Sequence, residues 1–286
     1  MSDLHAINDA INKRAGRKLL PSIATSLSLM AGVWALLKYF PAGFAALVAL
    51  ALVLAIKELA HAFSSTDTYV SKRSLMASAV GLSAGAWFSG IRGLAIGLGI
   101  ALSLMLIALL RKGSHGFIKS ASASVFALVY LPFLAGFLIL LARPHNGLEQ
   151  IMVFVLLVAS NDTFAYVTGV LIGKHPMAPK HSPKKTWEGL AGSIIFTTFI
   201  GYLTFDGILD LNPWIGAAVG LLIVFTATTG DLIESAIKRD LAIKDMGDLL
   251  PGHGGVLDRI DSILYAAPTL WLALEIVRRA QDSGLL

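Results

Sequence analysis

The chain contains no cysteine among its 286 residues. That absence excludes disulfide bonds, thiolate chemistry and any zinc site built on cysteine. Charged residues are also scarce, at 14% of the chain, whereas soluble domains have about 25%. Hydrophobic residues make up 56% of the chain and the mean hydropathy is +0.73. This composition argues against ordinary soluble domains and indicates a polytopic membrane protein.

Uncharged runs predict where the chain crosses the membrane. A helix needs about 20 predominantly apolar residues to span a bilayer. The runs of suitable length without Asp, Glu, Lys or Arg are 19–37, 39–56, 74–91, 93–110, 120–142, 189–205 and 211–230. Two further candidates, 148–173 and 262–277, each contain acidic residues. Because lipid cannot satisfy open backbone groups, we expect an all-α fold of about nine transmembrane helices, with eight as the alternative.

Lysine and arginine predict the orientation of these helices. The polar segment 1–18 is followed by no clear cleavage site, so 19–37 is interpreted as a retained helix. With a cytoplasmic N-terminus, seventeen of the 23 lysines and arginines lie inside and five outside. The pI of about 9.4 reflects this bias and some attraction to anionic lipid heads, and it does not indicate nucleic-acid binding.

This orientation places two long polar loops, 173–189 and 231–261, on the cytoplasmic side. The sequence predicts no soluble domain elsewhere, so any chemistry is expected in these loops and the helix ends beside them. We therefore divide the chain into 1–145, with about five transmembrane helices, and 146–286, a catalytic region that carries both loops.

Carboxylates lie at two predicted helix ends on that side. Asp231 directly follows an uncharged run of 20 residues, and Glu234 lies on the same helical face. Asp258 and Asp261 are three residues apart and open the last helix. A solvated helix end would explain Asp231 and Glu234. A cap at the start of a helix would explain Asp258 and Asp261. Two converging pairs nevertheless favour an oxygen-liganded divalent ion, with magnesium the first choice.

Basic residues and glycines lie between and beside these carboxylates. The second loop has Lys238, Arg239 and Lys244, followed by the glycine turn "PGHGG" at 251–255. Glycine allows backbone amides to approach an anion closely. The first loop adds "SPKKTWEG" at 182–189, which is also typical of a juxtamembrane basic patch that touches lipid heads. Carboxylates, basic side chains and glycine amides together favour a polyphosphate ligand.

The same residues resemble the signature of the phosphatidate cytidylyltransferase family, also called CDP-diacylglycerol synthases. The similarity lies in "SAIKR" (235–239), "KDMG" (244–247) and "LPGHGGVLDRID" (250–261). The segments "DTFAYVTG" (162–169) and "SPKKTWEG" (182–189) also resemble family motifs and occur in the family's order. In the first half of the chain only the general hydropathy is similar.

The resemblance implies a reaction of phospholipid biosynthesis in which CTP and phosphatidate give CDP-diacylglycerol and diphosphate. It implies an integral protein of the bacterial plasma (inner) membrane with its active site facing the cytoplasm. The expected partners are CTP, phosphatidate and the lipid bilayer, with no nucleic acid, and a homodimer is allowed. The expected cofactor is Mg²⁺, with room for a second cation.

Phosphatidate already carries an anionic oxygen, so positioning and electrostatics are needed more than a strong base. We expect the metal on Asp231 and Asp258, with Asp261 close by and Asp162 as a further ligand or a partner of a lysine. The expected catalytic residues are Asp231, Lys238, Lys244, Asp258 and Asp261. The expected substrate-binding residues are Ser182, Lys184, Lys185, Ser235, Arg239, His253, Gly254, Gly255 and Arg259.

Two other classes of membrane protein fit less well. A CDP-alcohol phosphotransferase needs an Asp-Gly pair that is followed, after two residues, by Ala-Arg. The segment "DGIL" (206–209) lacks the Ala-Arg. A transporter would explain the intramembrane Asp162 and Glu58, but not a contiguous glycine-rich loop dense in both charges. For Glu58 and Lys57, a structural ion pair or a reach to the interface is expected rather than catalysis.

Overall fold

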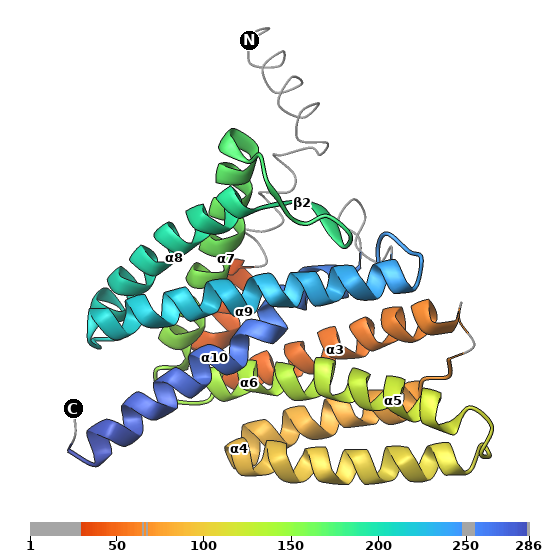
Figure 1. Ribbon diagram of the computed structural model, residues 1–286. Helices are drawn as coiled ribbons and strands as arrows, with labels where there is room; N and C mark the ends of the chain where they lie inside the picture. The colour runs from red at the N-terminus through yellow and green to blue at the C-terminus, as the bar shows by residue number, and fades with distance from the viewer. Residues whose placement is uncertain (1–29, 65, 67, 248–254, 285–286) are drawn as a thin grey trace, which may run out of the picture.

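The computed structural model describes residues 30–64, 66, 68–247 and 255–284, and its architecture is all-α (Figure 1). Residues 30–39 are helical. The helices that follow are α3 (Pro41–Ser64), α4 (Lys72–Leu110), α5 (Phe117–Leu128), α6 (Leu134–Ala142), α7 (Gly147–Ile172), α8 (Trp187–Gly207), α9 (Pro213–Asp240) and α10 (Leu257–Asp282). A π-helical turn, η1 (Val129–Phe133), joins α5 and α6 into one span.

Within the described residues, seven helices are long and apolar enough to cross a membrane. One of them, α4, contains both of the predicted spans 74–91 and 93–110, with a reversal between them. The first predicted span, 19–37, lies mostly outside the described residues. The all-α membrane fold is therefore confirmed, while the count of nine helices and the cytoplasmic N-terminus stay predictions.

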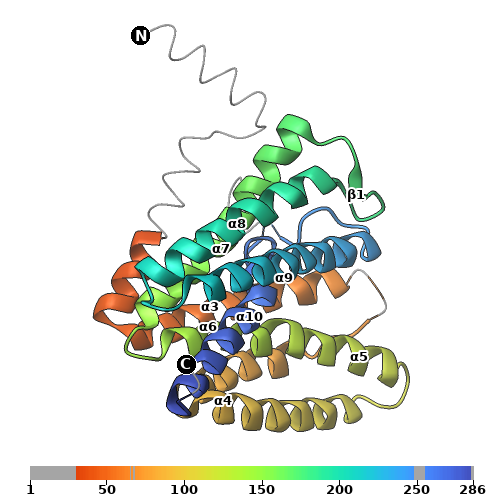
Figure 2. The same ribbon diagram turned by 60° about the vertical axis from the view of Figure 1, so that its left-hand side comes forward.

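The reversal inside α4 depends on glycine. Gly90 has φ 63° and ψ −147°, a backbone conformation that residues with a Cβ rarely adopt. The two halves then run antiparallel, as Figures 1 and 2 both show. They pack so closely that a Cβ on Gly85 would lie 2.7 Å from the carbonyl oxygen of Gly93. Arg143 Nε covers the turn by donating to the carbonyl oxygen of Trp87 at 2.8 Å.

The bundle is layered around α3, α6 and α10. Figures 1 and 2 show these helices in the middle, with α4 on one side and α7 and α8 on the other. The core there is apolar and fully buried, as at Phe154, Leu131 and Leu264. Large apolar side chains such as Phe88 and Ile96 face outward, which suits a lipid environment.

A short antiparallel hairpin of β1 (Pro176–Ala178) and β2 (Ser182–Thr186) connects α7 to α8. His175 Nδ1 lies 2.6 Å from Glu188 Oε1, so the strand that leaves α7 is tied to the first turn of α8. Arg239 Nε at the end of α9 donates to the carbonyl oxygen of His181 at 3.3 Å. The hairpin therefore lies over the end of α9 (Figure 1), and the two loops predicted to share a site lie together.

The packing inside α4 gives a stability prediction. Gly93→Ala should lower the free energy of unfolding by about 1–3 kcal/mol, because the new Cβ would collide with the Gly85 carbonyl and force the two halves apart. Gly99→Ala is the matched control, since nothing lies within 4 Å of a Cβ there. Thermal unfolding in detergent micelles compares the two variants, and equal melting temperatures would contradict this packing.

Candidate functional site

The first loop forms one ion pair with α9, at a residue inside that helix. Lys185 Nζ lies 2.6 Å from Asp231 Oδ2, and these side chains are 27% and 24% exposed. Thr186, the next residue, caps α8 by accepting a hydrogen bond from the amide of Gly189 at 3.1 Å. The cap fixes the start of α8. It therefore also fixes the position of Lys185, which directly precedes Thr186.

A second ion-pair cluster joins α9 to the start of α10. Lys238 Nζ lies 2.5 Å from Glu234 Oε2 and 3.0 Å from Asp258 Oδ1. The Glu234 and Asp258 side chains are only 3% and 8% exposed. Asp258 Oδ2 also accepts the amide of Gly255 at 2.8 Å and that of Met246 at 3.0 Å. Both oxygens of Asp258 are therefore already engaged, but with a lysine and with amides that precede α10, so Asp258 does not act as a helix cap.

Three other carboxylates come together from α7, α9 and α10. Asp162 and Asp231 line one cavity, and buried Asp261 lies near enough to both for their like charges to repel. Asp162 is exposed on α7, and it accepts a hydrogen bond from Asn161 Nδ2 at 3.0 Å. Among the described residues, no three acidic or histidine side chains are placed to hold a metal ion by themselves. An ion here would need further oxygens from a ligand.

Two polar hollows adjoin each other beside the hairpin. The polar cavity, of about 310 Å³, is lined by Asn161, Asp162, Ala165, Tyr166, Met177, Ser182, Lys184, Lys185, Thr186, Gly189, Leu190, Thr228 and Asp231. The basic recess, of about 190 Å³, is lined by His181, Ser182, Pro183, Lys184, Ser235, Lys238, Arg239, Ile243 and Lys244. Ser182 and Lys184 line both. Four of the predicted substrate-binding residues and two of the predicted catalytic residues thus surround one recess: Ser182, Lys184, Ser235 and Arg239, with Lys238 and Lys244.

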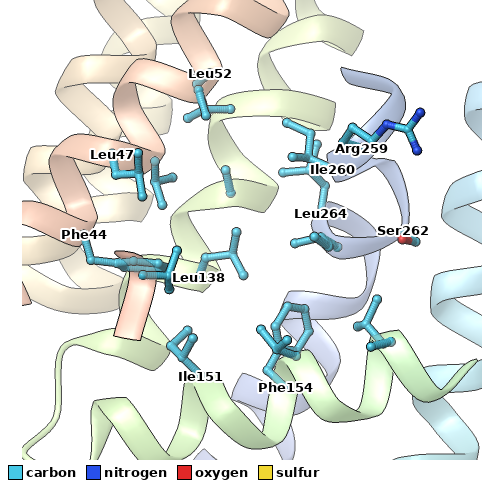
Figure 3. A pocket seen from close by; sticks show the side chains of 18 of the residues that line it. Phe44, Leu47, Leu52, Leu138, Ile151, Phe154, Arg259, Ile260, Ser262 and Leu264 are labelled. Atoms are coloured by element: carbon cyan, nitrogen blue, oxygen red, sulfur yellow. The ribbon is translucent and has the colours of Figure 1, made fainter. Parts of the chain in front are cut away.

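A third hollow, the apolar cavity, meets the polar cavity at Asp162. It has a volume of about 380 Å³ and is enclosed by α3, α6, α7 and α10. Figure 3 shows apolar side chains such as Phe44, Leu138 and Phe154 around it, with Arg259 at its margin. Asp162 lines this cavity as well as the polar cavity. A hollow lined by hydrocarbon therefore adjoins one lined by charges.

The glycine turn is only partly described. His253 and Gly254 lie outside the described residues, so their expected roles stay predictions. The amide of Gly255 points at Asp258, and a Cβ there would lie 2.6 Å from Glu58 Oε2. The close approach that requires this glycine is therefore to a carboxylate of the protein, whereas the sequence suggested a phosphate.

Glu58 is the residue whose role the sequence did not reveal. Of the two roles expected for Glu58 and Lys57, an ion pair between them does not occur, since Lys57 is exposed and Glu58 is buried against backbone. Glu58 Oε1 and Oε2 accept the amides of Val256 and Leu257 at 2.9 and 3.0 Å. These contacts join positions 198 and 199 residues apart, and no local spacing could have signalled them.

The fold and these hollows define an integral membrane protein that presents cationic and anionic side chains beside an apolar cavity. Comparison with known proteins gives the family. The Cytidylyltransferase family matches residues 22–277, and the chain belongs to this family.

The relatives agree with that assignment. A phosphatidate cytidylyltransferase of Mycobacterium bovis is 36% identical over 280 residues, which cover 92% of this chain and 90% of the relative. One of Staphylococcus haemolyticus is 35% identical over 239 residues, covering 81% of this chain and 88% of the relative. The family expected from the sequence motifs is therefore confirmed.

The cluster around Lys238 gives a second stability prediction. Lys238→Met should lower the free energy of unfolding by about 3 kcal/mol, because Glu234 and Asp258 would then be nearly buried without their shared cation. Lys244→Met, at an exposed position of the same loop, should change it by less than about 0.5 kcal/mol. Unfolding in micelles measures both variants, and equal losses would show that the shared cation does not stabilise the fold.

Proposed function

We propose that this protein transfers the cytidylyl group of CTP to phosphatidate, forming CDP-diacylglycerol and diphosphate. One observation carries the proposal: three hollows of different chemistry adjoin in a row. Asp162 lines both the apolar and the polar cavity, and Ser182 and Lys184 line both the polar cavity and the basic recess. Such a row suits one ligand with hydrocarbon tails and a second with several phosphates. The relatives named phosphatidate cytidylyltransferase support the same substrates.

Phosphatidate would place its acyl chains in the apolar cavity. The polar side chains in the lining of that cavity are Asp162, Arg259 and Ser262. Arg259 is exposed at the first turn of α10, and a guanidinium can bind a phosphate through two parallel hydrogen bonds. The lipid phosphate would therefore lie at the end of the apolar cavity that faces the polar cavity.

CTP would place its phosphates in the basic recess. Lys184, Arg239 and Lys244 are exposed there, so their cations can meet a ligand. Lys238 is already bound to Glu234 and Asp258, so we assign it a role in holding the recess together. Ser182 and Ser235 add hydroxyl donors to the same lining.

The reaction then needs little chemistry from side chains. An anionic oxygen of phosphatidate attacks the α-phosphorus of CTP, and the new O–P bond forms as the bond to the bridging oxygen breaks. The electron pair of that bond leaves with diphosphate. The protein's contribution is to hold two mutually repelling anions together and to neutralise charge on the leaving group. Lys184 and Lys185, which line the polar cavity between the substrates, are placed to do so.

Magnesium fits the acidic side of the polar cavity. Asp162 and Asp231 line it, Asp261 lies nearby, and Mg²⁺ commonly takes one or two carboxylates together with substrate phosphates. When bound, the ion would offset the charge of the phosphates. We favour this set over Asp258, whose oxygens are taken by Lys238 and two amides.

The apolar helices make this an integral membrane protein, and we propose the inner membrane of a bacterium as its location. The basic recess lies where the two loops predicted to be cytoplasmic meet. CTP would therefore enter from the cytoplasm, while phosphatidate would enter from the bilayer.

A turnover assay tests the proposal. In mixed micelles with CTP and Mg²⁺, the protein should release diphosphate only when phosphatidate is added, and EDTA should stop the reaction. Asp231→Asn should lower turnover at least about 100-fold, because it removes a charge that positions Lys185 and the metal.

Asp206→Asn is the control, since about 20 helical residues separate it from the start of α8, roughly 30 Å. It should stay within twofold of the unmodified protein. Diphosphate release without phosphatidate would contradict the function, and Asp231→Asn activity within threefold would remove that residue from the site.

A further inference from the structure

Glu58 reaches the start of α10 from the middle of the bundle. It lies on α3 and is 8% exposed. Its two carboxylate oxygens each accept one backbone amide, from Val256 at 2.9 Å and from Leu257 at 3.0 Å. Amides at the start of a helix have no partner within the helix. Glu58 therefore supplies, from another helix, the acceptors that α10 lacks.

Two glycines allow the chain to pack against this carboxylate. A Cβ on Gly247 would lie 2.9 Å from Glu58 Cδ. A Cβ on Gly255 would lie 2.6 Å from Glu58 Oε2 and 2.9 Å from the amide nitrogen of Gly247. The chain thus returns at Gly255 to nearly the place that it left at Gly247. Both ends of that segment meet on Glu58.

Asp258 holds the same two ends. Its side chain accepts the amides of Met246 and Gly255 and pairs with Lys238. Leu257, whose amide binds Glu58, directly precedes it. A shift of the Glu58 contact would therefore move Asp258 and the residues that follow it.

We propose that Glu58 is a positioning residue for the transfer reaction proposed above, on which this inference rests. Its carboxylate fixes the first turn of α10 and, with it, Arg259 at the apolar cavity and Asp261 beside the acidic cluster. Among the described residues no lysine, arginine or histidine pairs with Glu58, so the positive end of α10 balances its charge. Glutamine at this position would direct an NH₂ group at one of the two amides.

The test compares Glu58→Gln with Lys57→Gln, an exposed neighbour on the same helix. Glu58→Gln should lower kcat about 10–100-fold, because small displacements of reacting groups are costly. Hydrogen exchange of the Val256 and Leu257 amides should quicken at least about tenfold, since each loses a buried acceptor or its alignment. Exchange in the second half of α10 should not change. Lys57→Gln should match the unmodified protein in both measurements.

A second variant removes the contact from the other side. Val256→Pro deletes one donor amide, and the φ of −64° at that position suits proline. Its kcat should fall by the same order as in Glu58→Gln. The double variant should be no slower than the slower single variant, because both changes remove one interaction.

Two results would overturn the proposal. If Glu58→Gln keeps kcat within twofold of Lys57→Gln although amide exchange quickens, the contact stabilises the fold without positioning the site. If exchange does not quicken, Glu58 does not hold the turn. Should Glu58→Gln fail to fold, a normal kcat in Val256→Pro would overturn it equally. A lack of product from both the unmodified protein and Lys57→Gln would contradict the proposed function instead, and exchange would still decide whether Glu58 holds the turn.

Discussion

The beginning of α10 must find acceptors for its free amides among packed helices, and the rest of the site depends on how it does so. Unpaired backbone groups are costly away from water. Glu58 from α3 and Asp258 from α10 itself accept four amides on the two segments that meet there. Lys238 then ties Asp258 to α9. One helix start therefore brings α3, α9 and α10 together at the edge of the basic recess.

The same constraint explains why the charged side chains beside the polar cavity and the basic recess occur in pairs. Charged side chains in an apolar surrounding need partners, and both Lys185 and Lys238 pair with carboxylates there. The polar cavity lies beside these pairs. Asp162 lines both this cavity and the apolar cavity. Fixed charges of this kind can stabilise a transition state without reorganising. A lipid phosphate and a nucleotide could meet at Asp162 while each keeps a surrounding that suits it.

Local patterns in the sequence predicted what depends on local chemistry. The uncharged run 189–205 lies within α8 (Trp187–Gly207), because an uncharged stretch in lipid has to form a helix. Contacts between separate helices left no such signal. The sequence left Glu58 between an ion pair and a reach to the interface, and it gave no sign that Glu58 and Asp258 both accept backbone amides of the last loop. Spacing along one helix shows which side chains share a face, but not what that face meets.

A lipid in the apolar cavity and a nucleotide in the basic recess should meet at Asp162. The most direct measurement is a structure of the protein bound to phosphatidate and a non-hydrolysable CTP analogue. In that structure the acyl chains should lie beside Phe44, Leu138 and Phe154, with the lipid phosphate and the α-phosphate of the nucleotide both in the polar cavity. A lipid bound on the outer face of α4, or a nucleotide outside the basic recess, would contradict it.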